Sequence, residues 1–174
     1  MIRPAALILA LLLAGPAGAA TVLSVGDGDT IRVSDGGRRL TIRLACIDGP
    51  ETAQRPYGTA SRQRLQALAP IGSAVTLRPQ TTDKYGRLVA EVIGEINLNL
   101  AMVEDGQAFA YRQYLAGCDA REYLDAEFRA SRRRHGIWQV EEGITRPWDF
   151  RRRPRGSSHA RLEASTPRLW LPHC

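Results

Sequence analysis

The chain has 174 residues, which is enough for one domain with a buried apolar core and some accessory segments. Its formal net charge of +6 favours polyanionic partners such as nucleic acid. Every Lys or Arg position except Lys84 is arginine, which is more typical of genomic base composition than of phosphate recognition. Beyond the first 20 residues no apolar run is long enough to cross a bilayer, so we do not expect an integral membrane protein.

The N-terminal residues 1–20 have the parts of a secretory signal peptide. A basic start at Arg3 precedes an apolar run over residues 5–14 and a small-residue end over residues 15–20. The apolar run is shorter than the roughly 20 residues that a spanning helix needs. We therefore expect cleavage near Thr21, a secreted or periplasmic protein, and no stable membrane association after cleavage. A buried N-terminal helix is the alternative interpretation.

The cysteines are Cys46, Cys118 and Cys174. An exported chain meets oxidising conditions, which permit a disulfide. The number is odd, and no Cys-x-x-Cys pair or His/Cys cluster indicates zinc. We favour a Cys46–Cys118 bridge that leaves Cys174 free, and the alternative is that Cys46 is a small core residue. We expect a monomer, although Cys174 leaves the oligomeric state open.

The segment after the predicted leader has the alternation of short strands. Residues 31–33 and 40–44 alternate apolar and polar side chains, and a glycine pair between them marks a turn. By this alternation Cys46 shares the inward side of the second strand, whereas Arg43 points to the opposite face. Pro50 ends the extended run.

The later part of the chain alternates helical and extended patterns. In chain order we expect a helix over residues 57–68, strands near 75–77 and 88–93, a helix from Asn97 to about residue 104, an extended segment at 108–111 and a helix over 119–134. Asn97 can cap the second helix and Gly106 can end it. The apolar faces of the first and last helices are marked by Ala60, Leu65 and Leu68 and by Tyr123, Leu124 and Phe128.

These elements predict one α+β domain over residues 21–140. Five short strands, with one helix after the third and two near the end, favour a five-stranded oligonucleotide/oligosaccharide-binding (OB) barrel with about three packed helices. Residues 141–174 contain an arginine-rich run and many Ser, Thr and Pro residues. This composition favours a basic, partly disordered tail over a second domain. The arginine run either binds nucleic acid or is a solvated charged segment.

An Asp-Gly-Asp turn is the first candidate for metal binding. Asp27 and Asp29 flank Gly28, and a glycine lets a tight loop bring oxygens together. Calcium takes about six to eight oxygen ligands. The turn is not an EF-hand loop, because the twelfth position counted from Asp27 is Arg38 rather than glutamate. On their own, two aspartates near a turn more often form local hydrogen bonds.

Further carboxylates and two arginines turn this loop into a candidate phosphodiesterase site. Asp29, Asp48 and a nearby main-chain carbonyl could hold a cation and leave room for water and a substrate phosphate. Glu51 could orient or deprotonate the attacking water. Arg43 and Arg87 could each form paired hydrogen bonds to phosphate oxygens as charge builds in the transition state.

At these positions the chain closely resembles the staphylococcal-type thermonuclease family. The motifs occur in the family's order: Gly28-Asp29-Thr30, Arg43-Leu44, Ile47-Asp48, Pro50-Glu51, Asp83-Lys84-Tyr85-Gly86-Arg87, Asn97 with its helix, Ala110-Tyr111, and Gly136-Ile137-Trp138. Any one of these motifs is weak evidence, but the ordered set is specific. The resemblance covers about residues 21–140, which is most of the expected mature chain.

The resemblance implies an activity and a role for each site residue. It implies a calcium-dependent endonuclease that hydrolyses DNA and RNA and leaves 3′-phosphate ends. The implied calcium ligands are Asp29, Asp48 and the carbonyl of Gly49. The implied catalytic residues are Arg43, Glu51 and Arg87. The implied nucleotide contacts are Lys84, Tyr85 and Tyr111.

The chain departs from the family pattern at three places. Gly49 stands where a larger residue such as threonine is usual, which keeps a carbonyl ligand but removes a side chain. Gln113 stands where a second tyrosine is expected, with Tyr114 one residue further on. The connection over residues 52–57 is short. Two other functions stay open from the sequence: a non-hydrolytic nucleic-acid-binding barrel, and a calcium-stabilised module that binds other polyanions.

Overall fold

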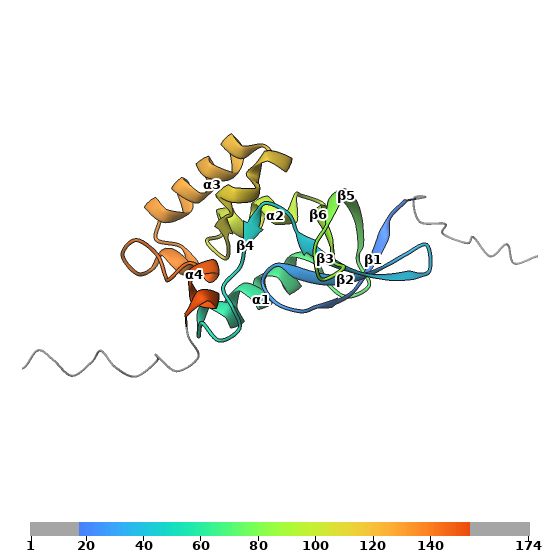
Figure 1. The fold of residues 1–174 in the computed structure, drawn as a ribbon, viewed down its shortest axis with the longest axis horizontal. Coiled ribbons are helices and arrows are strands. Elements are labelled where there is room, and N and C mark those ends of the chain that lie inside the picture. The colour runs from blue at the N-terminus through green and yellow to red at the C-terminus, as the bar shows by residue number, and fades with distance from the viewer. Residues whose placement is uncertain (1–17, 154–174) are drawn as a thin grey trace, which may run out of the picture.

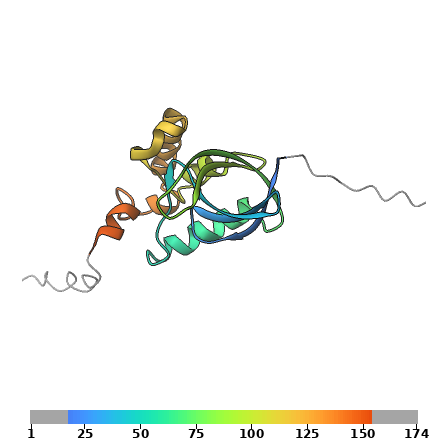
Figure 2. The same cartoon turned by 45° about the vertical axis from the view of Figure 1, so that its right-hand side comes forward.

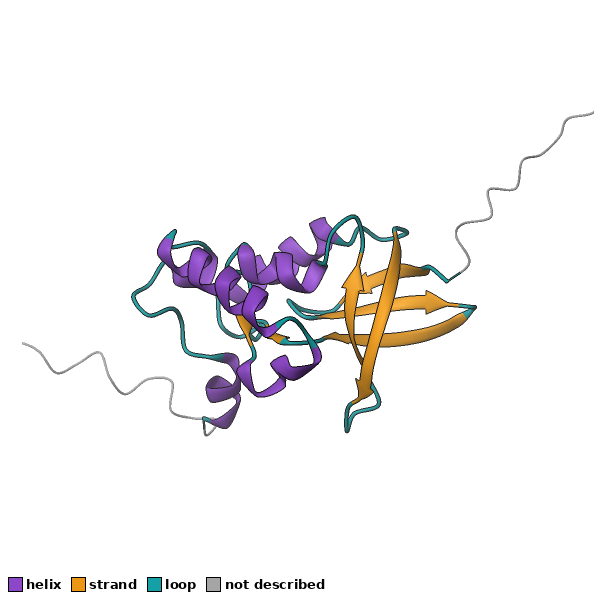
Figure 3. Cartoon of the chain, turned by 90° about the horizontal axis from the view of Figure 1, so that it is seen from above, coloured by secondary structure: helices purple, strands orange, loops and turns teal. Residues whose placement is uncertain are grey.

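A computed structural model describes residues 18–153 of the chain. It has a β-barrel at one end and most of its helices at the other (Figure 1), and the same separation is clear from above (Figure 3). Most of the predicted signal peptide, the last part of the predicted tail and Cys174 lie outside the described residues. Within residues 18–153, no helix is long and apolar enough to span a membrane.

The barrel is closed by five strands in the order β1-β2-β3-β6-β5, which confirms the predicted five-stranded barrel. Its strands are β1 (Ala20–Val25), β2 (Thr30–Asp35), β3 (Arg38–Leu44), β5 (Ala74–Thr82) and β6 (Leu88–Ile93). The pairs are antiparallel except β3 with β6, which run parallel. Figure 2 shows the strands as a ring with α1 (Tyr57–Leu68) beside it.

The helical end contains the predicted helices and some shorter elements. The predicted helices are α1, α2 (Leu98–Glu104) and α3 (Ala120–Arg132). The additional elements are η1 (Arg112–Gly117) and η2 (Gly136–Trp138), which are 3-10 helices, α4 (Pro147–Arg152), and a small sheet of β4 (Ile47–Asp48) with β7 (Phe109–Ala110). Asn97 caps α2 as expected, because its side chain accepts hydrogen bonds from the backbone N–H groups of Asn99 and Leu100.

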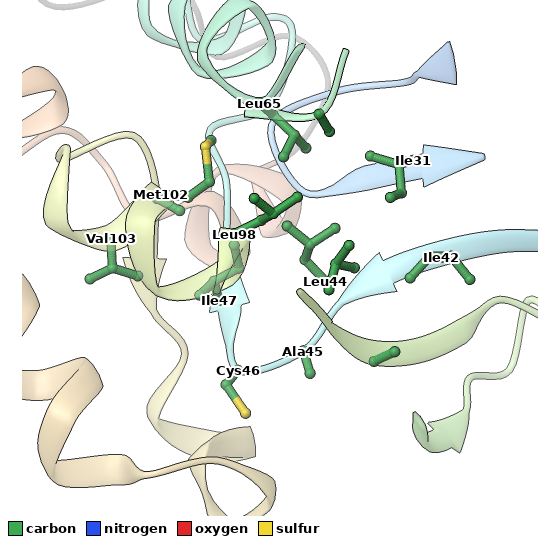
Figure 4. Packing of buried hydrophobic residues seen from close by; sticks show 14 of the residues in the cluster. Ile31, Ile42, Leu44, Ala45, Cys46, Ile47, Leu65, Leu98, Met102 and Val103 are labelled. Carbon is green, nitrogen blue, oxygen red and sulfur yellow. The ribbon is translucent and has the colours of Figure 1, made fainter. Parts of the chain in front are cut away.

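The core fills the barrel and continues under the helices. Figure 4 shows Ile31, Ile42 and Leu44 from the strands close to Leu65 of α1 and Leu98 of α2. All five of these side chains are at most 1% exposed. Burial of such aliphatic side chains stabilises a fold by roughly 1.5–3 kcal/mol each. These packed side chains therefore hold the barrel and the helices together.

The extended run after β3 differs from the prediction. The chain turns at Cys46, which has a φ of +66°, and then forms β4, which pairs with β7 and not with the barrel. Cys46 is nevertheless buried and forms the predicted disulfide with Cys118. The buried Asn99 side chain holds this turn, because its amide donates to the carbonyl of Ala45 at 2.9 Å. The turn therefore delivers Asp48 to the junction between the barrel and the helices.

Two helix faces also differ from the predicted ones. In α1, Ala60 is exposed, and the buried positions are Gly58, Ser61 and Leu65. In α3, Phe128 is 65% exposed, because the face that packs is built from Tyr123, Ala126, Glu127 and Ala130. The helical period shows which positions are apolar but not which of them pack against the rest of the domain. In α3 the small side chains of Ala126 and Ala130 lie on the packed face, where they allow closer packing than Phe128 would.

The segment after Trp138 folds back on the domain. Residues 141–153, which we expected to belong to a basic, partly disordered tail, form turns and then α4. Pro147 is buried, and the carbonyl of Thr145 accepts a hydrogen bond from Gln54 Nε2 at 2.8 Å. The Arg146 guanidinium carbon lies 4.2 Å from the centroid of the Phe109 ring. These contacts place α4 beside the loop that follows β4.

Candidate active site

Two tight loops meet at the end of the barrel that faces the helices. The N–H of Gly49 donates a 2.6 Å hydrogen bond to Asp29 Oδ2. A Cβ added at Gly49 would lie 3.1 Å from the carbonyl carbon of Gly28, tighter than most such contacts. A Cβ at Gly28 would in turn collide with Ser61 of α1. Glycine at position 49 therefore fits the close approach of the two loops.

Arg43 connects the carboxylates that these loops carry. Its Nη2 lies 2.7 Å from Asp48 Oδ1 and 3.2 Å from Asp29 Oδ2. Its Nη1 donates to the carbonyls of Leu44 and Ile47 at 2.9 and 3.0 Å. Arg43 is thus fixed by main-chain contacts, and one of its nitrogens reaches both aspartates. The two carboxylates converge on a single point.

Burial makes it costly to ionise the two carboxylates at this point. Burial raises the pKa of Asp29 to about 7, and the charges of Asp27 and Asp48 add to the rise, while Arg43 and the Gly49 N–H oppose it. Asp48 is fully buried. Ionised carboxylates in such a place are costly unless cations compensate them. The pair of aspartates is therefore a place where positive charge is strongly favoured.

Glu51 is held at the edge of the same cluster. Its backbone N–H donates to Gln54 Oε1 at 2.9 Å, and its carbonyl accepts from the Gln54 N–H at 2.8 Å. This turn fills the short connection before α1. The side chain of Glu51 is 36% exposed, so its carboxylate can reach solvent while its backbone is fixed.

Arg151 of α4 is a member of the cluster that the sequence analysis did not identify. Its Nη2 lies 2.7 Å from Asp48 Oδ2, and its Nη1 lies 2.6 Å from Glu51 Oε1 and 3.2 Å from Asp48 Oδ1. Burial lowers the pKa of Arg151, but the hydrogen bonds to Asp48 and Glu51 outweigh it and raise that pKa. Arg151 therefore stays charged. The sequence offered one signal, the aromatic residues Trp148 and Phe150 just before the arginine run.

Tyr111 lies beside this cluster in an aromatic group. Its ring stacks on Trp148 at 4.9 Å and 3°, and meets the ring of Tyr114 edge-on at 4.8 Å. Burial raises the pKa of Tyr111, and the charge of Asp48 adds to the rise. Gln113 is exposed, so Tyr114 and Trp148 supply the aromatic neighbours that the family pattern led us to seek at position 113. The sequence analysis did not identify Trp148.

Lys84, Tyr85 and Arg87 lie apart from the cluster, on the hairpin between β5 and β6. Asp83 organises this turn: its Oδ1 accepts from the N–H groups of Tyr85 and Arg87, and its Oδ2 accepts from Arg87 Nε at 2.7 Å. Burial raises the pKa of Asp83, but these hydrogen bonds and the charge of Arg87 outweigh it, so that pKa is lowered. The ring of Tyr85 is largely exposed, with Lys84 Nζ at 5.1 Å and Arg87 Cζ at 5.5 Å from its centroid.

The hairpin and the cluster share one side of the sheet. Arg43 pairs with Val89 in the parallel β3–β6 register. Arg87 comes two residues before Val89, so the alternation of the strand puts it on the same face as Arg43. Among residues 18–153, no hydrogen bond or ion pair joins Arg87 to Asp29, Asp48 or Glu51. Asp29, Arg43, Asp48, Gly49 and Glu51 thus form one cluster, and Arg87 faces the same side from the hairpin.

The cluster has the donor chemistry of a hard-cation site. Two carboxylates and the Gly49 carbonyl are oxygen donors, the type that calcium prefers. No group of three or more His, Cys, Asp or Glu residues that could hold a metal occurs within the described part of the chain. A cation here would therefore rely on the two aspartates, main-chain oxygen and water. That set fits calcium, which tolerates mixed ligands and flexible geometry.

Comparison with known proteins gives a consistent result. The sequence profile of a family described as "Staphylococcal nuclease homologue" matches residues 41–140. A "Micrococcal nuclease" of Shigella flexneri is 33% identical over 171 residues, which is 91% of this chain and 96% of that protein. "Protein ParB" of Escherichia coli is 34% identical over 165 residues, or 87% and 91% of the two chains. An "Uncharacterized endonuclease" of Escherichia coli O157:H7 is 36% identical over 134 residues, or 76% and 84%.

Proposed function

We propose an exported, calcium-dependent endonuclease function for this chain, which belongs to the staphylococcal nuclease family. The resemblance seen in the motifs is confirmed by the family match, and the nuclease-named relatives support an endonuclease that hydrolyses nucleic acid. They favour hydrolysis over the two non-hydrolytic alternatives. Calcium, export, 3′-phosphate products and the roles of individual residues are the finer parts of the proposal.

The observation that carries the proposal is the convergence of two buried carboxylates. Asp29 and Asp48 approach one point closely enough for a single nitrogen of Arg43 to contact both. Glu51 lies at the rim of the same point and is partly exposed. A buried anionic pair can hold a hard cation, and a partly exposed carboxylate beside it can act on water, which are two functions that metal-assisted hydrolysis of a phosphodiester uses.

In this proposal Asp29, Asp48 and the Gly49 carbonyl hold calcium. The ion, when bound, would polarise a phosphate oxygen and lower the pKa of bound water. Burial of both aspartates excludes bulk water from their oxygens, which strengthens every charge interaction at the site.

The other side chains act on water and on the phosphate. Glu51 orients the attacking water and accepts its proton at the exposed edge of the cluster. Arg43 and Arg87, which face the same side of the sheet, donate N–H groups to the phosphate oxygens as negative charge builds, and for Arg43 this requires Nη2 to exchange its aspartate contacts for the phosphate.

Nucleotide contacts come from the hairpin and the aromatic group. Lys84 and Tyr85 are exposed beside Arg87, where a cation and a ring can contact a phosphate and a sugar or base. Tyr111 lies close enough to the cluster for the charge of Asp48 to raise its pKa, although burial is the larger cause. The proposed substrates are DNA and RNA, and the proposed products carry 3′-phosphate ends, as the family resemblance implies.

Export rests on the sequence of the first 20 residues. Their basic, apolar and small-residue parts are those of a signal peptide. The Cys46–Cys118 disulfide fits an oxidising compartment. We therefore propose a secreted or periplasmic protein, which acts as a monomer. Processing near Thr21 would be read from the N-terminal sequence of protein recovered from the periplasm or medium.

The test is digestion of single-stranded DNA and RNA by the chain beginning at Thr21. We expect digestion with added calcium and none after chelation, with fragments that a polymerase extends only after phosphatase treatment. Glu51→Gln is the matched control, because it keeps the shape of the side chain and removes its charge. Undiminished digestion after chelation would reject the calcium site, and fragments that a polymerase extends directly would reject the 3′-phosphate products.

A further inference from the structure

Among residues 18–153, Arg151 is the one basic residue whose side chain contacts Glu51. Its guanidinium reaches two carboxylates of the candidate site at once, Asp48 at 2.7 Å and Glu51 at 2.6 Å. These partners are 103 and 100 residues away in sequence, so local chain geometry does not impose the contacts. Arg151 also lies beyond residues 41–140, which the family profile matches. Nothing in the family motifs assigns it a role.

The segment that carries Arg151 is anchored on both sides. Before α4, the Thr145 carbonyl accepts from Gln54, whose other amide atom holds the backbone of Glu51. Within α4, Trp148 stacks face to face on Tyr111. Stacked aromatic pairs contribute roughly 0.5–1.5 kcal/mol beyond the area they bury. The position of Arg151 therefore follows from packing, in contrast to an ordinary surface arginine that happens to meet an acidic residue.

The two arginines together contact both oxygens of Asp48, and their shortest contacts are to different oxygens. Arg43 Nη2 contacts Oδ1, and Arg151 Nη2 contacts Oδ2. The Asp48 carboxylate is fully buried, so its orientation depends on these two partners. Arg151 then extends its second nitrogen to Glu51. A guanidinium fork can fix two carboxylates in one plane, whereas the single ammonium of lysine cannot.

We propose that Arg151 is a positioning residue of this active site, which sets the Asp48 and Glu51 carboxylates in their relative places. The inference rests on the proposed nuclease function and deepens it. Arg151 has a second effect on the same site, because its charge lies directly against Asp48. That positive charge weakens the attraction of Asp48 for a divalent cation. Arg151 thus has two opposite effects: it places the carboxylates for catalysis, and it lowers the affinity of the site for calcium.

Measurements of kcat and of calcium affinity can separate these two effects in the chain beginning at Thr21. For Arg151→Ala, we expect kcat on a short DNA substrate at saturating calcium to fall about 10–100-fold. We expect calcium to bind about 3–10-fold more tightly by titration calorimetry, because a repelling charge has been removed. A collapsed site would lose both properties together, whereas loss of Arg151 separates them.

Arg151→Lys isolates the fork from the charge. It retains one positive charge beside Asp48 but cannot reach both carboxylates with fixed geometry. We expect its calcium affinity to stay within about 2-fold of the wild type, with kcat still about 10-fold lower. Arg152→Ala is the matched control, since Arg152 is the neighbouring residue of α4 and its ion pair is with Asp149 at 3.5 Å. Both measurements should be unchanged in that variant.

Each outcome decides between named alternatives. If Arg151→Ala keeps or raises kcat, α4 is at most a cover over the site and the positioning role is wrong. If calcium affinity and kcat both fall in Arg151→Ala and also in Arg151→Lys, Arg151 is a general structural support and the inference is again wrong. The wild-type arm reports on the proposed function separately: a wild type that binds no calcium and cleaves nothing rejects the function, together with the inference that rests on it.

Discussion

The carboxylate cluster and the β5–β6 hairpin carry the two groups of site residues, and they are built in opposite ways. The cluster joins residues from the β1–β2 loop, β3, β4 and α4 through contacts that span up to 103 residues of sequence. The hairpin is held by Asp83, whose partners are at most four residues away. Asp48 is fully buried, whereas Tyr85 is 72% exposed.

The difference separates two tasks of the same site. Charges in the buried cluster act at low effective dielectric and in fixed places, so they suit binding a cation and aligning water. Charges on the exposed hairpin are screened by salt and can adjust to a substrate. We therefore expect changes in the cluster to alter both chemistry and stability, and changes to the exposed cations of the hairpin to alter mainly substrate turnover or binding.

The largest expected effect separates Arg43 from Arg87. Arg43→Ala and Arg87→Ala should each lower the rate of DNA digestion by about 100–1,000-fold, because each removes a phosphate-binding guanidinium. Only Arg43→Ala should also destabilise the calcium-free protein, by about 3–5 kcal/mol, since it removes the cationic partner of the buried Asp29 and one of the two partners of Asp48. Initial rates and urea unfolding in chelator measure the two effects. Equal stability of both variants would remove the distinction between the cluster and the hairpin.

The disulfide gives the next largest effect, and it should also fall on the cluster. Cys46 stands just before β4, and its bond to Cys118 closes a separation of 72 residues. Replacing both cysteines with serine should cost about 2–4 kcal/mol in unfolding free energy. It should also weaken calcium binding, because the turn that carries Asp48 loses a restraint. The protein with the disulfide and its double serine variant would both carry Cys174→Ser, so that neither has a free thiol. An unchanged calcium affinity would show that the turn is held without the disulfide.

The pH dependence of stability should have opposite signs in the two regions. Burial raises the pKa of Asp29 to about 7 from 3.8, so ionising it in the calcium-free protein costs stability as pH rises from about 4 to 7. That cost should reach roughly 3–4 kcal/mol, at about 1.4 kcal/mol per pKa unit. The pKa of Asp83 is lowered, so its contribution is present above the unfolded pKa and is lost as pH falls through the folded pKa.

Asparagine variants isolate these two contributions. The stability of the wild type minus that of Asp29→Asn should decrease from pH 4 to 8. The same difference for Asp83→Asn should be nearly constant over that range and should decrease as pH falls below 3.8, the ordinary pKa of aspartate. Urea unfolding in chelator from about pH 2 to 8 gives both curves. If Asp29→Asn shows no decrease, the carboxyl at position 29 is not energetically strained by burial, and its expected attraction for a cation loses its main physical support.

The barrel was predictable from the sequence for a local reason. The alternation at residues 31–33 and 40–44 and the glycine turn between them set the strands without help from distant residues. The grouping of Asp29 with Asp48 was a hypothesis from the types of residue present, and the family resemblance supported it. The convergence of the two carboxylates depends on the approach of Gly28 to Gly49, which no local pattern records.

The missed residues share a different cause. Arg151 and Trp148 belong to a helix of six residues that is placed by stacking on Tyr111, and their arginine-rich surroundings have the composition of a solvated tail. Phe128 was misplaced because helical spacing shows that a side chain is apolar but does not show that α3 packs through alanines. In each case tertiary packing overrode a valid local signal.

The smallest expected effect is at Lys84 and tests the hairpin by itself. Lys84 is exposed, and its ammonium lies 5.1 Å from the centroid of the Tyr85 ring. Lys84→Ala should raise KM for DNA about 3–10-fold at low salt and less than about 2-fold at high salt, because a surface charge on a phosphate is screened. Stability should change by less than about 0.5 kcal/mol. Arg121→Ala, which removes an exposed charge from α3, should leave KM unchanged. A salt-independent rise in KM would instead mean that Lys84 acts in a desolvated contact, and the hairpin would then resemble the buried cluster more than its exposure indicates.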